Sequence, residues 1–527
     1  MFRLAGKILI SLSLGVPTLV GAEDLNKILG AQSSQELTVI QKERRSMLVS
    51  LMGSGAKGAF GDAFVQGKWK KALELWGSQV EGKGAFALSD NGKGLLGFIL
   101  FVNGFEVLGI ETLFSVKDPT QVFSMLKAEW NKVAVSSNPA WKLVRVKWHP
   151  EWTKTFGVGI KIRAMAWRLR GDTDLQEIEA MITKTMPNTA ERAWLQWQLV
   201  TSFALREKEG EAAKLLGPLI REKVHPISKD LLTLTAARLL YKRGFLDMAA
   251  KYYGQIPKSS FYWFVAQEEL AWIYLRKGRN QDVIAQTNTF AYTNFGNLVG
   301  PEVYYLRALG QLQICDYPNG AKTLIEFKRR FRARTKQMLK VEKKGVGNNN
   351  NIDSLVQKLS IPGLSVKAAG TLVAELFPRK ILRDEEIRQL VQSILAFDRE
   401  LVKANSFKGI SSYQWLTEEL KFKISKLKME LNNRVKTLAS RELKEIDDVL
   451  TKMYVVEVEM IQQVDSAAKR LAKMGSKIPK GQLRKGQTGS IAKDALVFQH
   501  KASEVWFDEL ANYKVNVTQF CQNKGGK

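Results

Sequence analysis

Histidine and cysteine are scarce in this chain of 527 residues, which has three histidines and two cysteines. His149, His225 and His500 are far apart, and no spacing typical of a zinc site or a thiol–imidazole pair occurs. A phosphate-binding loop and a Gly-x-Ser-x-Gly nucleophile motif are also lacking, since residues 53–58 have glycines and a lysine without the required spacing. We therefore expect no catalytic, cofactor-binding or metal-binding residues and no enzymatic activity.

Long apolar runs are confined to the start of the chain. Arg3 and Lys7 precede an apolar stretch, residues 8–19, which is followed by the small residues of Val20-Gly21-Ala22. This pattern is typical of a cleaved secretory signal peptide. The apolar stretch is too short for a membrane span, because roughly 20 apolar residues are needed to cross a bilayer. An uncleaved anchor is the alternative interpretation. We expect residues 1–22 to be a signal peptide, no transmembrane span after it, and a protein that is periplasmic or secreted.

Acidic residues are outnumbered by basic ones, 52 to 80, which gives a formal net charge of +28. Such an imbalance affects partners and encounter rates rather than the fold. An exported protein meets lipid headgroups, cell-wall polymers and acidic protein surfaces, so we expect these partners and no nucleic acid. General solubility is the other interpretation of the charge.

The strongest positive signal is an internal repeat. Gly210, Gly244 and Gly278 are separated by two successive steps of 34 residues. Each glycine lies between two amphipathic stretches, and glycine suits the bend of a helical hairpin because it adopts left-handed backbone angles without a steric cost. Two equal steps favour a true repeat over an accidental spacing in an ordinary helical domain.

Small and apolar residues recur at fixed distances from these glycines. They are Ala237, Leu240, Ala249 and Tyr253 in one unit, and Leu270, Ala271, Tyr274 and Val283 in the next. Here the chain resembles the tetratricopeptide repeat (TPR) family, of the exported bacterial envelope type. The resemblance implies an all-α fold in which helical hairpins stack into a superhelix with a concave groove for partner proteins. We assign the array to residues 23–335, with the clearest units at 190–330.

On the TPR template, one face of the first helix in each hairpin lines the groove. The predicted partner-binding residues are Trp197, Arg238, Tyr241, Lys242, Glu268, Trp272 and Arg276. Arginine forms bidentate bonds with carboxylates and tryptophan offers rigid contact area, so this set suits acidic or aromatic segments of a partner. Each residue could equally be a packing or a solvated position.

Basic residues concentrate after the array. The predicted basic patch consists of Lys328, Arg329, Arg330, Arg332, Arg334, Lys336, Lys340, Lys343 and Lys344. A solvated helix end and a contact with anionic polymer or lipid are equally favoured interpretations. An Asn/Gly-rich stretch follows, so residues 336–352 are predicted to be a basic linker between domains.

Longer helices are predicted beyond that linker, in a domain of residues 353–474. One should cover 384–404, and a second should open near Ser411 and run to Met474. The second has coiled-coil-like apolar positions at a seven-residue step, whose register shifts between residues 439 and 445. Either an intramolecular hairpin, which we favour, or a coiled-coil partner would bury them.

The last segment, residues 475–527, is expected to be mobile at first and to end in a tail. It contains Cys521, which in an oxidising compartment could form a disulfide with Cys315. Two separate thiols are the alternative, because sequence separation gives no information on distance.

Together these features favour a periplasmic protein-binding scaffold or assembly factor of a cell-envelope machine, which grips its partners in a TPR groove. A binder of anionic envelope polymer or lipid through the basic surface is the alternative. A cryptic cell-wall-active enzyme is the second alternative, because two distant carboxylates would leave no local motif. The identity of the partner and the oligomeric state are not defined by these patterns.

Overall fold

The computed structural model describes residues 34–81, 85–117, 140, 143, 175–185, 187–222, 227–292, 297–361, 364, 366–407, 413–473 and 514–515. These residues form helices and turns without a β-strand, which confirms the all-α fold class. The predicted signal peptide and Cys521 lie outside the described residues. No helix among the described residues is long and apolar enough to span a membrane.

The chain divides into two compact units, which are described separately. Unit 1 comprises Met1–Ala164 and Phe397–Lys421, and unit 2 comprises Met165–Ala396 and Phe422–Lys527. The helices that lie wholly in unit 1 are α2 (Ser34–Met52), η1 (Gly53–Lys57), α3 (Ala59–Val65), α4 (Trp69–Leu75), η2 (Trp76–Val80), α5 (Ala85–Leu88), α6 (Asp90–Val102) and α7 (Glu106–Phe114).

The α6–α7 hairpin of unit 1 is built on close backbone contact. A Cβ atom at Gly97 would lie 2.8 Å from the carbonyl oxygen of Gly109, and a Cβ at Gly109 would lie 2.8 Å from that of Gly97. Only glycine at both positions permits this approach. Glu400 caps the first turn of α7, where its carboxylate accepts hydrogen bonds from the N–H groups of Val107 at 2.7 Å and Leu108 at 3.2 Å. The cap ties two distant parts of the sequence together within unit 1.

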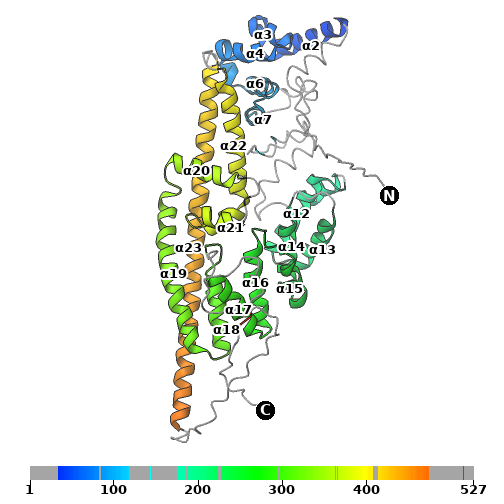
Figure 1. Cartoon of the computed structure of the whole chain (residues 1–527). Coiled ribbons are helices and arrows are strands. Elements are labelled where there is room, and N and C mark those ends of the chain that lie inside the picture. The colour runs from blue at the N-terminus through cyan, green and yellow to red at the C-terminus, as the bar shows by residue number, and fades with distance from the viewer. Residues whose placement is uncertain are drawn as a thin grey trace, which may run out of the picture. The chain divides into compact units, whose positions relative to one another are not determined.

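Unit 2 contains a series of helical hairpins followed by longer helices (Figure 1). The hairpins pair α12 with α13, α14 with α15, α16 with α17, and α18 with the start of α19. Their bounds are α11 (Leu175–Thr183), α12 (Ala190–Leu205), α13 (Glu209–Arg221), α14 (Lys229–Lys242), α15 (Leu246–Gly254), α16 (Trp263–Arg276), α17 (Asn280–Tyr292), α18 (Glu302–Gln313) and α19 (Tyr317–Lys344).

The bends of the hairpins share one backbone geometry. A residue with φ between 57° and 83° ends the first helix at Gly67, Gly104, Glu207, Gly244, Gly278 and Cys315. At every one of these bends its N–H donates to the carbonyl three residues earlier, and the next N–H donates to the carbonyl five residues earlier. This pair of hydrogen bonds is the Schellman motif of helix C-termini. The repeat is therefore visible in the backbone as well as in the sequence.

Gly210 is not the bend of its hairpin, although Gly244 and Gly278 are. It lies in the first turn of α13, and Glu207 takes the positive φ instead. The spacing of the bends from Glu207 to Cys315 is thus 37, 34 and 37 residues rather than a uniform 34. The sequence prediction was wrong at this bend because glycine is preferred there but not required, and another residue adopts the conformation at a modest cost.

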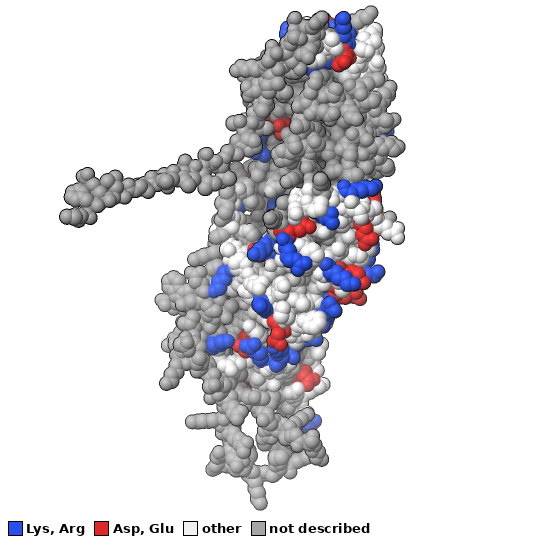
Figure 2. Space-filling model, turned by 90° about the vertical axis from the view of Figure 1, so that its right-hand side faces the viewer, with Lys and Arg blue, Asp and Glu red and all other residues white. Residues whose placement is uncertain are grey.

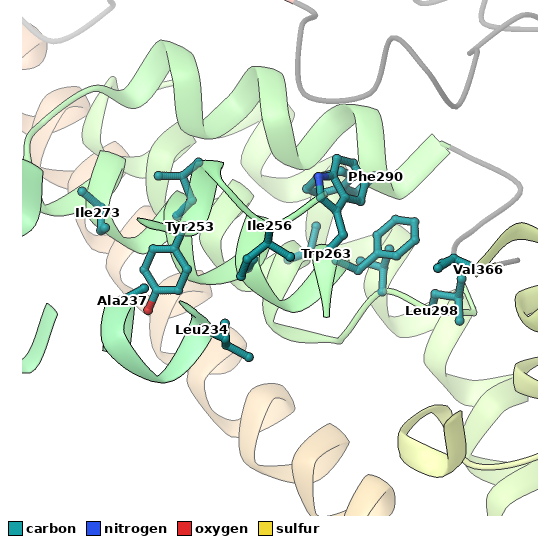
Figure 3. Packing of buried hydrophobic residues seen from close by; sticks show 14 of the residues in the cluster. Leu234, Ala237, Tyr253, Ile256, Trp263, Ile273, Phe290, Leu298 and Val366 are labelled. Carbon is teal, nitrogen blue, oxygen red and sulfur yellow. The ribbon is translucent and has the colours of Figure 1, made fainter. Parts of the chain in front are cut away.

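The core of the array is formed where second helices pack on first helices (Figure 3). Ala237 and Ala249, predicted as small packing positions, are both fully buried. The rings of Trp263, Phe264 and Phe290 meet edge to face, with centroids 5.0 to 5.9 Å apart. These contacts bury large apolar groups at the preferred aromatic geometry, so this hairpin is a stable centre of unit 2.

The helices after the array are α20 (Asn349–Leu359), α21 (Val366–Ala369), η5 (Gly370–Ala374), η6 (Arg379–Arg383), α22 (Glu385–Asn405) and α23 (Gln414–Lys473). Most of the predicted linker, residues 336–352, is helical, since α19 continues to Lys344 and α20 begins at Asn349. Asn348 caps α20, because its side chain accepts a hydrogen bond from the N–H of Asn351 at 3.0 Å. The asparagine run therefore begins a helix.

The long helix α23 keeps its course while its packing partner changes. Leu431, Val435 and Leu438 pack in a cluster with residues of α20 and α22. Further along, Ile446 and Met453 pack in a second cluster with residues of α18 and α19. Helix α19 contributes to both clusters, since its Met338 and Val341 lie in the first, so the change is from α20 and α22 to α18. It falls where the seven-residue register was predicted to shift, and the shift reflects this change of intramolecular partners along one continuous helix.

Candidate functional site

The predicted groove residues lie on the first helices of successive hairpins, and four of the seven contact a neighbouring first helix. Arg238 donates to Glu269, with Nε 2.9 Å from Oε2 and Nη2 2.6 Å from Oε1. The guanidinium of Arg276 lies 5.0 Å from the ring centroid of Tyr241. The first helices α14 and α16 therefore lie side by side, as the TPR resemblance implies. We call this side of the first helices α12, α14 and α16, together with the side of α18 that faces Trp272 of α16, the inner surface.

The remaining predicted residues divide between packing and surface positions. Trp197 is half-buried against the apolar cluster of α12, α13 and α14. Trp272 faces Tyr305 of α18, with ring centroids 6.0 Å apart. Lys242 is exposed and pairs with Glu209 of the preceding hairpin at 3.2 Å. Figure 2 shows basic and acidic side chains interspersed where α12 to α15 lie, so this face does not carry a field of one sign.

The inner surface of α18 is covered by the chain's own long helix. Tyr304 and Ala308 of α18 are buried in one apolar cluster with residues of two other helices. These are Leu324, Phe327 and Phe331 of α19, and Ile446, Val449, Met453, Val456 and Met460 of α23. We call this cluster the apolar contact. In addition, the ammonium group of Lys452 in α23 lies 5.6 Å from the ring centroid of Tyr305 in α18. No partner could reach α18 here without displacing α23.

A network of buried charges replaces the apolar contact at the next helix, α16. Arg379 of η6 is central: its Nη2 lies 2.5 Å from Oε1 of Glu445 and its Nη1 lies 3.8 Å from Oε1 of Glu268. Glu442 accepts from the backbone N–H of Arg379 at 2.7 Å and from Nε of Arg334 at 2.7 Å. We call these five residues the polar centre. Arg379 and Glu442 each expose only 5% of their side chains, so the charges depend on one another.

Burial perturbs the ionisation of this network. It raises the pKa of Glu268 to about 7, and attraction to Arg379 only partly offsets the effect. Burial also acts on Glu445, but the neighbouring Arg379 and Lys380 outweigh it and lower the pKa of that carboxyl. Burial and then repulsion from Arg379 lower the pKa of Arg383 to about 10. Attraction to Glu268 and Glu445 acts in the opposite direction and only partly offsets these two effects.

A pocket of about 360 Å³ opens beside the polar centre. Arg238 of α14, Glu269 of α16 and Tyr262, which directly precedes α16, are in one wall. Arg383 and Arg441 lie in the opposite wall, which η6 and α23 supply. Among the described residues, no carboxylate is within ion-pair distance of either of these two arginines. The lining also includes five carboxyl groups, those of Glu268, Glu269, Glu302, Asp384 and Glu445. The pocket is therefore of mixed charge, and Arg383 and Arg441 are the two cations in it that could pair with a carboxylate from outside.

The predicted basic patch is divided between two faces of α19. Lys328, Arg330 and Arg334 are used within unit 2: Lys328 pairs with Glu457 at 3.0 Å, Arg330 donates to the Tyr304 hydroxyl at 3.1 Å, and Arg334 belongs to the polar centre. The side chains of the other six are exposed, namely Arg329, Arg332, Lys336, Lys340, Lys343 and Lys344. A run in sequence is therefore not one patch in space, because a helix distributes it around its axis.

Cys315 occupies the positive-φ bend between α18 and α19. Its predicted disulfide partner, Cys521, is outside the described residues, so the pair stays a prediction. Within the described ranges, no group of three or more His, Cys, Asp or Glu side chains is placed to hold a metal ion.

Sequence reasoning missed the residues of η6 and α23 that meet Glu268. Arg379 and Glu445 are more than 100 residues from it along the chain, and no local motif links them. The sequence did contain one indication: Glu442 and Glu445 lie between residues 439 and 445, where the seven-residue register of α23 was predicted to shift. Buried charge at a break in an apolar pattern marks a special contact.

The repeated bends and the shared inner surface define a helical-repeat protein. Residues 134–287 match the family model described as "Tetratricopeptide repeat protein 21 ARM repeat". This region is therefore similar to the TPR and ARM repeats, which bears out the repeat resemblance for that part of the chain. No curated protein and no solved structure matches the chain.

Proposed function

We propose that this chain is a protein-binding scaffold of the cell envelope, whose partner binds the open end of the inner surface. The TPR/ARM-like repeat suggests protein binding. One observation carries the location: the chain's own helices cover α18, reach α16 through the polar centre, and leave α14 bordering a pocket. Arg238, Lys242 and Arg276 are exposed at this open end.

The partner on this proposal presents an acidic side chain beside an aromatic or aliphatic one. Arg383 and Arg441 offer the pocket two guanidinium groups, and arginine binds carboxylates in a bidentate manner. Tyr262, which precedes α16, and Val265 of α16 give the same pocket an apolar wall. Arg238 is already paired with Glu269, so it orients the entrance rather than supplying a free charge.

Site-specific photocrosslinking in the producing cell tests the location. A photoreactive amino acid at Tyr241 should give a discrete adduct with one or a few proteins. The control is Met248, which is 47% exposed and lies on α15, a second helix that is not part of the inner surface. The adduct should disappear when Arg383 and Arg441 are both changed to Gln. Equal adducts from Tyr241 and Met248, or an adduct that survives the double change, would contradict the proposal.

The envelope location is supported by the charge and apolar pattern of residues 1–22. Cell fractionation followed by N-terminal sequencing tests it independently of binding. The protein should be recovered outside the cytoplasm and should begin near Glu23. Recovery from the cytoplasm with Met1 retained would contradict export, and would leave the binding proposal intact.

A further inference from the structure

The exposed cations of α19 form a continuous row along one face of that helix. Lys322, Arg329, Lys336 and Lys343 are spaced by seven residues, so they lie almost above one another on a helix. Arg332, Lys340 and Lys344 are exposed beside them. We call these seven residues the basic row. At 1.5 Å per residue the row is roughly 33 Å long.

No exposed acidic side chain interrupts the basic row within α19. The helix has two acidic residues, Glu326 and Glu342, and both are half-buried. Glu326 pairs with the buried Arg307 of α18. The opposite face of α19 is held by Leu324, Phe327 and Phe331 in the apolar contact, so the helix cannot rotate to hide its cations. Figure 1 shows α19 beside α23 at the margin of unit 2.

Two apolar side chains share the exposed face with these cations. Ile325 is 66% exposed and Leu339 is 40% exposed. Their positions, seven residues either side of Arg332, place them in the same stripe of the helix. A folded helix that presents cations with interspersed apolar groups is suited to lying flat at the headgroup level of a membrane.

We propose that the basic row docks α19 on an anionic lipid surface. Clusters of four to eight Lys and Arg residues bind acidic lipids, each contributing about a fivefold increase in partitioning when it lies near the surface. A lipid surface is favoured over an acidic protein groove, because the row is straight and single-sided and its apolar groups are too few for a packed protein interface. Docking through α19 goes beyond the proposed partner binding and does not depend on it.

Sedimentation of the full chain with lipid vesicles tests the proposal. The protein should bind vesicles of phosphatidylglycerol and not vesicles of phosphatidylcholine, and added salt should weaken the binding. Changing Arg329, Lys336 and Lys343 together to Gln should lower the partition constant on the order of a hundredfold. The matched control changes Lys208, Lys214 and Lys251, which are exposed on or beside second helices of the array, to Gln. It should lose much less binding.

Helix content and thermal unfolding of both triple variants should match the parent chain, since all six side chains are exposed. Changing Ile325 and Leu339 to Ser should weaken binding several-fold even at high salt, because it removes the apolar part. Equal binding to both vesicle types, or an equal loss in the two triple variants, would overturn the lipid assignment. So would tighter binding to polyglutamate or to DNA than to phosphatidylglycerol through the same three residues.

Discussion

The apolar contact and the polar centre are neighbouring parts of one association between the array and α23, yet they are held by opposite means. Met453 and Phe327 are almost completely buried among apolar side chains, where association is favoured by the removal of apolar surface from water. Arg379 and Glu442 are equally buried but charged. Their mutual attraction mainly offsets the cost of removing them from water.

The difference between these two parts explains where the inner surface is closed and where it is open. Separating α23 from α18 would expose the apolar contact to water, so α18 stays covered by α23 in the folded protein. The polar centre contributes little net free energy while all its members are present, and it borders a pocket with two further arginines. Binding sites on this surface are therefore expected beside the charged part, at α14 and α16.

Removal of one partner from the polar centre should have the largest effect. Arg379→Ala leaves Glu268 and Glu445 buried without their main counter-charge, and should lower the free energy of unfolding of unit 2 by about 3–5 kcal/mol. Denaturant unfolding followed by circular dichroism measures it. The control is Lys380→Ala, whose side chain is 44% exposed and also pairs with Glu445. It should cost less than about 1 kcal/mol. Equal losses from the two variants would contradict a cooperative buried network.

Truncation in the apolar contact should have a somewhat smaller effect that does not depend on pH. Met453→Ala creates a cavity beside Phe327 and should cost about 3 kcal/mol. Val455→Ala, two residues further along α23 and 67% exposed, should change the unfolding free energy by less than about 0.5 kcal/mol. If both substitutions were equally mild, α23 would not pack on α18 and α19 as described.

The polar centre should also make stability depend on pH. Burial raises the pKa of Glu268 to about 7 from its ordinary value of 4.5, so the folded state binds more protons than the unfolded state between these values. Stability should therefore fall as pH rises through this window and be greatest near its acidic end. When unfolding is compared at pH values across this window, Glu268→Gln should remove part of the slope, about 3 kcal/mol in all.

A slope should remain in the Glu268→Gln variant, because the pKa of Glu400 in unit 1 is also raised to about 7 by burial. The double variant with Glu400→Gln should have a smaller slope than either single variant in the same window. Part of the slope should persist, because burial also raises the pKa of Glu302. A slope of the opposite sign in the parent chain, or one unchanged by both substitutions, would show that neither carboxyl titrates in this way.

The bends of the hairpins should give the smallest effects. Gly244 has φ of 83° and open space around its Cα, so Gly244→Ala should cost about 1 kcal/mol through backbone strain alone. Glu207→Gly relieves the same strain and should be neutral or stabilising by less than about 1 kcal/mol. Thermal unfolding of the two variants compares them. A loss in both would mean that the two bends are not equivalent.

Local patterns predicted the hairpins and their small packing residues, because helix periodicity and bend chemistry act within a few residues. They did not identify Glu207 as a bend, because glycine is the preferred residue at a bend and Gly210 lies three residues later. They also interpreted Asn348 and its neighbours as a linker, because asparagine is common both in turns and at the start of helices.

Contacts between residues that are distant in sequence were harder to predict. The seven groove residues were placed on the correct helices, but nothing near Glu268 indicates that Arg379 reaches it. The basic run was recognised, but the division between Arg334, which is inside, and Arg332, which is outside, depends on how α19 is rotated against α23. Such rotation is set by packing between segments that are distant in sequence.

Intramolecular photocrosslinking of the purified chain tests the central claim most directly, namely that α23 closes the inner surface at α18 and leaves it open at α14. A photoreactive amino acid at Tyr305, which lies below Lys452, should crosslink to the part of α23 around residue 452. The same probe at Tyr241 should give no adduct with α23. Adducts with α23 from Tyr241, or their absence from Tyr305, would contradict the account.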